Sequence, residues 1–172
     1  MARTPSWEAA YCEFFAARQR PLVRTAYAIL GSWPAAEDAT QTTFTQLYTH
    51  WPRIQPGAVD AYARRTLVNT CFRMGRRRAR ELSTAQPPDT AVGDPAGERA
   101  ERADLLEALS WLSARDRAVL ALRFLDDLPV AEVAAVLELP EGTVKSQTSR
   151  ALERLRAVLE PVDDSRTNRR NR

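Results

Sequence analysis

The chain has 172 residues and a mass of 19.3 kDa, which suits one ordinary domain or two small helical ones. Apolar residues make up 44% and charged residues 27%, so a real core can be buried and wholesale disorder is excluded. Residues 1–80 hold 12 Lys and Arg against 5 Asp and Glu, a net charge of +7, whereas residues 81–172 hold 13 against 17, a net charge of −4. This asymmetry indicates that one module meets a polyanion and that the other lies partly against protein.

The composition also argues against several classes of protein. Cys12 and Cys71 have neither metal-ligand spacing nor a disulfide framework, so we expect two buried free thiols and no metal or other cofactor. The single histidine, His50, stands beside Trp51 with no acid or nucleophile pattern near it, which argues against an enzyme.

No targeting or membrane segment is expected. No apolar run approaches the roughly 20 residues that span a bilayer, so no membrane insertion is expected. Trp7, Glu8 and Glu13 interrupt any signal-peptide core at the N-terminus, which makes the cytoplasm the expected compartment.

The first dense block, Trp7 to Arg80, is interpreted as four helices. Pro21 is expected to open a helix that ends at Gly31, with an apolar stripe of Leu22, Val23, Ala26, Tyr27 and Leu30. Pro34 opens the next helix, whose apolar side holds Ala36, Ala39, Phe44, Leu47 and Trp51. The polar side of that helix carries Glu37, Asp38, Gln41 and Thr45.

A long helix is predicted from about Ala58 to Arg80. At 100° per residue its apolar face holds Leu67, Val68, Cys71 and Met74. The opposite face lacks carboxylates and holds Tyr62, Arg65, Thr66, Asn69, Arg73, Arg76 and Arg77. Either this face is simply solvated, or it binds nucleic acid, with arginines on phosphates and Tyr or Asn on an unstacked base. The missing carboxylates favour nucleic acid, because a merely soluble face usually mixes signs.

The second block, about Glu101 to Leu159, is interpreted as four more helices. Ser113 begins a capping-box-like S-A-R-D, and a short helix follows with Val130, Val133, Ala134 and Leu137 at core spacing. After a break at Glu138-Leu139-Pro140, a last helix begins at Glu141. This order of a short helix, a tight turn and an amphipathic second helix is typical of a helix-turn-helix. Ordinary helical hairpins can share the same pattern.

The predicted fold is therefore all-α, with two small helical domains. Residues 1–82 form the first domain and residues 101–162 the second. The Pro- and Gly-rich residues 83–100 form a flexible linker, and residues 163–172 a disordered basic tail.

At this point the motifs resemble a known family. A-E-D-A-T-Q-T-T-F (residues 36–44) resembles the acidic helix of sigma region 2, and A-Y-A-R-R-T-L-V-N-T (61–70) resembles the helix of that region that handles the promoter −10 element. L-S-A-R-D-R-A-V-L-A-L-R-F (112–124), followed by G-T-V-K-S and R-A-L-E-R-L-R, is similar to sigma region 4. The order and spacing of these motifs resemble those of extracytoplasmic-function (ECF) RNA polymerase sigma factors, which keep only these two regions. The amino-acid composition resembles that of actinobacterial members of the family.

The resemblance implies partners and site residues. Core RNA polymerase would be gripped at its largest-subunit clamp helices by Glu37, Asp38 and Gln41, while region 4 meets the flap of the second-largest subunit. Promoter DNA would meet two sets of residues. The −10 set is Tyr62, Arg65, Thr66, Asn69, Arg73, Arg76 and Arg77, and the −35 set is Thr143, Lys145, Ser146, Gln147, Ser149 and Arg150. Family members are often held inactive by an anti-sigma factor, whose target would be the exposed faces of both blocks.

Three residues depart from the family pattern. Gln147 stands where many relatives carry a basic residue, which leaves the base read there open. Glu138 occupies a turn position that is often Gly, so it must accept an unusual backbone conformation. Pro129 replaces the usual Ser or Thr before the first helix of the motif and removes a side-chain cap.

Two other readings compete with a sigma factor. A stand-alone dimeric helix-turn-helix regulator would use the second block on a palindromic operator, but it would leave Glu37, Asp38 and Gln41 without a role. A helical enzyme lacks a recognisable catalytic pattern. A sigma factor is itself expected to do no chemistry, because the polymerase supplies it.

Overall fold

The computed structural model describes residues 6–82 and 107–159, and all regular elements in these ranges are helical. This agrees with the predicted all-α class. The linker predicted within 83–100 and the basic tail predicted at 163–172 lie outside the described residues. Within the described ranges, no helix is both long and apolar enough to cross a membrane.

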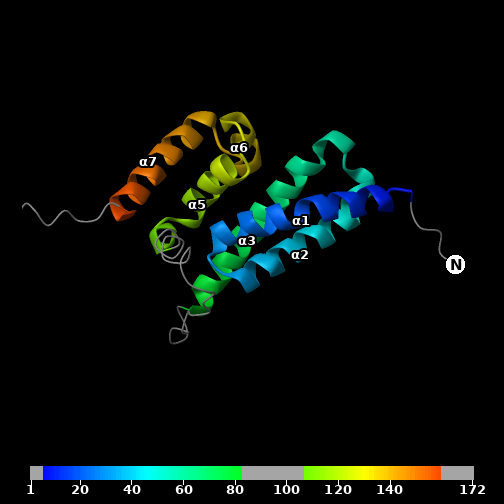
Figure 1. The fold of residues 1–172 in the computed structure, drawn as a ribbon, viewed down its shortest axis with the longest axis horizontal. Helices are drawn as coiled ribbons and strands as arrows, with labels where there is room; N and C mark the ends of the chain where they lie inside the picture. The colour runs from blue at the N-terminus through cyan, green and yellow to red at the C-terminus, as the bar shows by residue number, and fades with distance from the viewer. Residues whose placement is uncertain (1–5, 83–106, 160–172) are drawn as a thin grey trace, which may run out of the picture.

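The first domain contains three long helices: α1 (Glu8–Leu30), α2 (Trp33–His50) and α3 (Val59–Leu82) (Figure 1). Two short 3₁₀ turns, η1 (Trp51–Arg53) and η2 (Pro56–Ala58), connect α2 to α3. The prediction of four helices, with one opened by Pro21, is wrong, because α1 runs unbroken through that proline. Pro21 is exposed, and packing of α1 on both sides of it outweighs the one backbone hydrogen bond that it removes.

The helix ends follow the sequence signals. Gly31 adopts the left-handed conformation, with φ at 67°, and its N–H donates to the Tyr27 carbonyl at 2.7 Å. That hydrogen bond satisfies one of the carbonyls left free at the end of α1. Pro34 occupies the first turn of α2, where a missing N–H costs nothing.

The core of the first domain matches the predicted apolar faces of α2 and α3. Ala36, Ala39, Phe44 and Leu47 are buried on α2, as are Leu67, Val68 and Cys71 on α3. On α1, however, the buried residues are Leu22, Thr25, Ala26 and Ile29, while Val23, Tyr27 and Leu30 are only partly buried.

The prediction that both cysteines are buried is wrong for Cys12, whose side chain is exposed. The N-terminal half of α1 packs through Tyr11 and Phe14 onto Phe44 and Trp51. Cys12 follows Tyr11 by about 100° around the helix and faces solvent.

The second domain begins, among the described residues, with a helical segment at 107–110. It continues through α5 (Ala114–Leu120), a π-helical turn η3 (Ala121–Leu125), α6 (Val130–Leu137) and α7 (Glu141–Leu159). Ser113 caps α5 as predicted, with its Oγ accepting from the Asp116 N–H at 3.1 Å. Pro129 precedes α6 without a side-chain cap, and Glu138 ends α6 in the left-handed region at φ 55° and ψ 47°.

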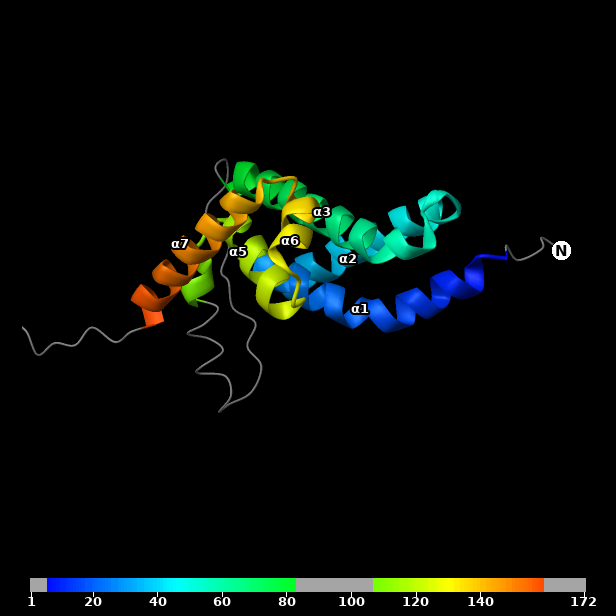
Figure 2. The same cartoon turned by 90° about the horizontal axis from the view of Figure 1, so that it is seen from above.

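The two domains pack against each other. α5 lies against α1, and α6 lies against α3, as Figures 1 and 2 show from two directions. One continuous apolar core crosses the boundary, joining Leu22 and Val68 of the first domain to Leu122 and Val133 of the second.

Candidate nucleic-acid interface

The −10 face predicted on α3 is largely accessible. Arg65, Asn69, Arg73, Arg76 and Arg77 are exposed, while Tyr62 and Thr66 are partly buried. Tyr62 packs against the edge of the core, and its ring centre lies 6.3 Å from that of His50. Tyr62 is therefore held at the edge of the core and stays partly exposed to solvent.

Two arginines of this face carry carboxylate partners. Arg77 pairs with Glu81 one turn later, at 2.8 Å, in an exposed position where such a pair adds little stability. Arg65 pairs with Glu138 at the end of α6, so a residue of the second domain lies on the −10 face of the first.

Beside this pair lies a crevice of about 340 Å³ between the domains. Asn69, Arg73 and Arg76 of α3 line one side of it, and Arg115 of α5 and Glu138 line the other. Arg73 also donates to the Thr70 hydroxyl at 3.3 Å. Three guanidinium groups with one carboxylate give the crevice the charge that phosphates prefer.

The −35 set lies on the first turns of α7. Lys145, Ser146, Ser149 and Arg150 are exposed, and Thr143 and Gln147 are partly buried. Arg150 folds back along the helix, donating to the Ser146 carbonyl at 3.2 Å and to its hydroxyl at 3.4 Å. Ser149 donates to Glu153 at 3.3 Å. These are local, exposed contacts that DNA could replace at small cost.

Gln147 differs from the other members of the −35 set. Its Oε1 is buried and, among the described residues, has no hydrogen-bond partner. An unpaired buried acceptor costs free energy until a donor reaches it.

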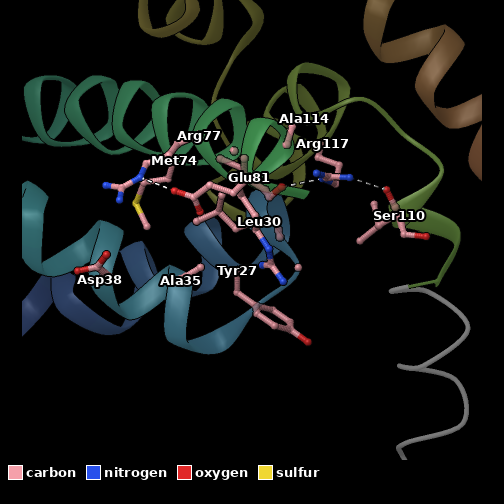
Figure 3. Close-up of a pocket in the computed structure, with 17 residues that line it drawn as sticks. Tyr27, Leu30, Ala35, Asp38, Met74, Arg77, Glu81, Ser110, Ala114 and Arg117 are labelled. Carbon is pink, nitrogen blue, oxygen red and sulfur yellow. Dashed lines mark hydrogen bonds and ion pairs between the residues drawn. The ribbon is translucent and has the colours of Figure 1, made fainter. Parts of the chain in front are cut away.

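The predicted docking face lies on α2, on the side away from the core. Glu37, Asp38 and Gln41 are exposed, and Phe44 beneath them is 3% exposed. Asp38 also stands at the edge of a groove of about 850 Å³, where Tyr27, Leu30 and Met74 provide apolar lining (Figure 3). Trp33 stacks on Tyr27 with ring centres 4.1 Å apart and is half exposed.

Sequence reasoning missed a set of residues that joins the domains. Asp126, directly after η3, accepts from the Thr25 hydroxyl at 2.8 Å and from Arg64 Nε at 3.3 Å. Arg117 of α5 is partly buried and donates from Nε to the Ile29 carbonyl at 2.7 Å. Figure 3 draws hydrogen bonds of Arg117 as dashed lines. The opposite net charges of the two halves indicated that they could attract each other, but they did not identify the residues involved.

Neither cysteine is placed for metal chemistry. Burial raises the pKa of the Cys71 thiol to about 12, so it stays protonated at neutral pH. Within residues 6–82 and 107–159 there is no group of three or more His, Cys, Asp or Glu side chains that could hold a metal ion.

The structure is an all-helical protein of two packed domains, with an arginine-rich face on α3, exposed polar side chains on the first turns of α7 and an acidic face on α2. Residues 14–81 match the model of the family Sigma-70 region 2, and residues 102–155 match Sigma-70, region 4. The chain is 37% identical over 153 residues to the RNA polymerase sigma-E factor of Streptomyces avermitilis, covering 88% of this chain and 86% of that protein. It is also 32% identical to the ECF RNA polymerase sigma factor SigE of Mycolicibacterium smegmatis, over 92% of this chain and 63% of that one.

This chain belongs to the extracytoplasmic-function RNA polymerase sigma factors. The similar proteins from Streptomyces and Mycolicibacterium agree with the actinobacterial character predicted from composition, and they do not favour the stand-alone regulator.

Solved structures share the fold. The sigma factor RpoE of Bartonella quintana, crystallised with the anti-sigma factor NepR, superposes with a TM-score of 0.77 at 24% identity, covering 90% of this chain and 98% of that one. CnrH, in complex with the cytosolic domain of CnrY, gives a TM-score of 0.69 at 22% identity, covering 88% of each chain.

Proposed function

We propose that this sigma factor binds core RNA polymerase through the acidic face of α2 and through its second domain, and that it directs initiation at promoters with two spaced elements. The observation that carries the proposal is that one small domain presents two unlike faces. One is an exposed acidic face over buried Phe44, and the other is an arginine-rich face with Tyr62 and Asn69.

Each surface has a role that its chemistry fits. Glu37, Asp38 and Gln41 would contact the clamp helices of the largest subunit, and the second domain would contact the flap of the second-largest subunit. On α7, Lys145, Ser146, Ser149 and Arg150, with Thr143 and Gln147, would read the −35 duplex from the major groove.

The −10 face would hold an unpaired base. Tyr62 and Asn69 supply a ring for stacking and an amide for base edges, while the neighbouring arginines hold phosphates. Binding energy at this pocket would offset the few kcal/mol that unstacking and unpairing a base cost. The polymerase would supply the nucleotidyl-transfer chemistry, and the complex would operate in the cytoplasm, without a cofactor held by this chain.

An anti-sigma factor is the further partner we propose, since both faces that the function needs are exposed on the free chain. The groove lined by Tyr27, Leu30 and Met74 beside Asp38 offers such a protein apolar contact next to the docking face. Co-expression with candidate anti-sigma proteins tests this: a stable complex that excludes core polymerase is expected. If no candidate protein competes with core polymerase for this chain, the proposal of an anti-sigma partner is wrong.

The deciding experiment combines co-purification with core RNA polymerase from an actinobacterium and transcription from a genomic promoter library. The expected result is a one-to-one complex whose transcripts start at sites sharing two spaced elements, with core polymerase alone giving none. Absence of a complex, together with tight binding of the free chain to a palindromic duplex, would establish the regulator instead.

A further inference from the structure

The crevice of about 340 Å³ beside α3 has the size and the charge of a site for a small anion. Binding pockets for small molecules measure about 300–1,000 Å³, so a volume at the lower end of this range suits a compact ligand. The lining includes three arginines, Arg73, Arg76 and Arg115, and the carboxylate of Glu138. Guanidinium groups bind phosphate oxygens in pairs of parallel hydrogen bonds, so phosphate is the anion that these side chains fit best.

The spacing of residues on α3 places two of the arginines together. Residues three or four apart on a helix share one face, so Asn69, Arg73 and Arg76 form one row along the crevice. Val68, which is buried, and Phe72, which is partly buried, also line the crevice from α3. This helix therefore provides two guanidinium groups and an amide next to apolar side chains.

The third guanidinium group comes from the second domain. Arg115 is exposed on α5, a helix that contacts α3. It belongs to neither the −10 set nor the −35 set, so promoter recognition gives it no role. Because Arg115 and the α3 row line the crevice from two different helices, a ligand between them would be held from more than one direction.

The arginines of the crevice have few partners of their own. Neither Arg76 nor Arg115 makes a hydrogen bond or an ion pair with any described residue. Arg73 makes one hydrogen bond within α3, at 3.3 Å. Glu138 is the one carboxylate that the described residues contribute to the lining, and it already pairs with Arg65. The three positive charges are therefore left to repel one another, and a bound anion would relieve that repulsion.

The number of arginines indicates the charge of the ligand. A phosphate group carries about −1.5 to −2 at neutral pH, so two joined phosphate groups balance three guanidinium groups and a single phosphate does not. Two arginines on α3 and one on α5 can then share the oxygens of both groups. The charge balance favours a diphosphate over inorganic phosphate.

We propose that this crevice is a binding site for a compact diphosphate, either inorganic pyrophosphate or the diphosphate group of a nucleotide. Arg73 and Arg76 hold the ligand from α3, and Arg115 holds it from α5. One consequence rests on the proposed function: the ligand competes with promoter DNA, because Asn69, Arg73 and Arg76 also belong to the −10 face. The concentration of the ligand then sets how readily the chain binds the −10 strand.

The test titrates pyrophosphate into the full chain by isothermal titration calorimetry, at physiological ionic strength and without divalent cations. Adenosine diphosphate and inorganic phosphate are titrated in parallel. One saturable site per chain is expected, with inorganic phosphate at least tenfold weaker than the better diphosphate. The diphosphate that binds more tightly identifies the source of the ligand, because only the nucleotide can also contact the apolar side chains of the crevice.

Arg115→Gln is the deciding variant, because it removes one guanidinium group and leaves both promoter sets intact. Its affinity for the diphosphate should fall about ten- to hundredfold, as the loss of hydrogen bonds between charged groups implies. The matched control is Arg156→Gln, which removes an exposed arginine on α7 of the same domain that does not line the crevice and should bind like wild type. If Arg115→Gln changes the circular dichroism spectrum, Arg73→Gln decides the question, with the same expected loss.

Competition is measured with a labelled single-stranded oligonucleotide that carries the −10 sequence mapped by library transcription. The diphosphate should displace it from wild type at concentrations that leave it bound to Arg115→Gln. Equal affinities of Arg115→Gln and Arg156→Gln, or a wild-type titration that does not saturate, would overturn the site even if the chain directs transcription. Binding without displacement would show that the competition is wrong. A chain that binds the diphosphate as expected but directs no transcription would instead contradict the proposed function and leave the site in place.

Discussion

Glu138 offers a direct test of how the turn between α6 and α7 is built. It is a non-glycine residue in the left-handed region, at φ 55° and ψ 47°, and its N–H donates to the Ala134 carbonyl to end α6. A side chain in this conformation costs about 1 kcal/mol relative to glycine, which usually fills this position. Its exposed pair with Arg65 returns only a few tenths of a kcal/mol.

Replacing Glu138 with Gly should therefore stabilise the chain by about 0.5–1 kcal/mol. For a domain of this size that corresponds to a rise in midpoint temperature of roughly 3–6 °C. Thermal unfolding followed by circular dichroism at 222 nm measures the shift. Glu138→Gln is the matched control, because it keeps the strained backbone and removes only the charge, so its midpoint should stay close to wild type.

Together the two variants distinguish an error in the backbone-strain argument from an error in the strength assigned to the Arg65–Glu138 pair. If Glu138→Gly melts at or below the wild-type temperature while Glu138→Gln is unchanged, the argument from backbone strain is refuted. If both variants lose the same stability, the pair with Arg65 outweighs the strain, and the second domain is held more by charge than its exposure suggests.

Three further predictions address the proposed surfaces and the two thiols. Replacing Glu37 and Asp38 together with Lys should lower affinity for core polymerase at least tenfold in a co-purification titration, because it reverses the charge of the docking face; normal assembly would refute the docking assignment. Asn69→Ala should leave polymerase binding intact but reduce promoter opening roughly ten- to hundredfold in a permanganate footprint, so each variant is the control for the other. Iodoacetamide at pH 8 should alkylate exposed Cys12 alone, because burial raises the pKa of Cys71 to about 12; two modified thiols on the folded chain would contradict the packing of α3.

Periodicity predicted the faces of α2 and α3 well because each of these helices has one buried side and one solvated side. Leu47 is buried opposite exposed Asp38, and Leu67 is buried opposite exposed Arg65, as a 3.6-residue repeat requires. Local chemistry likewise predicted Gly31, the Ser113 cap and the strained position of Glu138, because each depends on residues close by in the sequence.

The failures have a common physical origin in tertiary packing. Pro21 is a sound local signal for a helix start, but α1 is held along its length by α2 and continues through it. Thr25 is buried with its hydroxyl on Asp126 of the second domain, a contact that the sequence of α1 alone does not indicate. The same holds for Asp126, whose partners lie 101 and 62 residues away in the sequence.

In the folded chain, the opposite net charges of the two halves also allow ion pairs between the two domains. A basic first half suits promoter DNA, but before DNA arrives its arginines face the acidic second half, and two of them, Arg64 and Arg65, already pair with Asp126 and Glu138. The two pairs should respond differently to salt. Exposed Arg65–Glu138 is screened at physiological ionic strength, whereas the nearly buried Asp126 pair is screened far less. Raising salt should therefore free Arg65 on the −10 face while the two domains stay together around their shared apolar core.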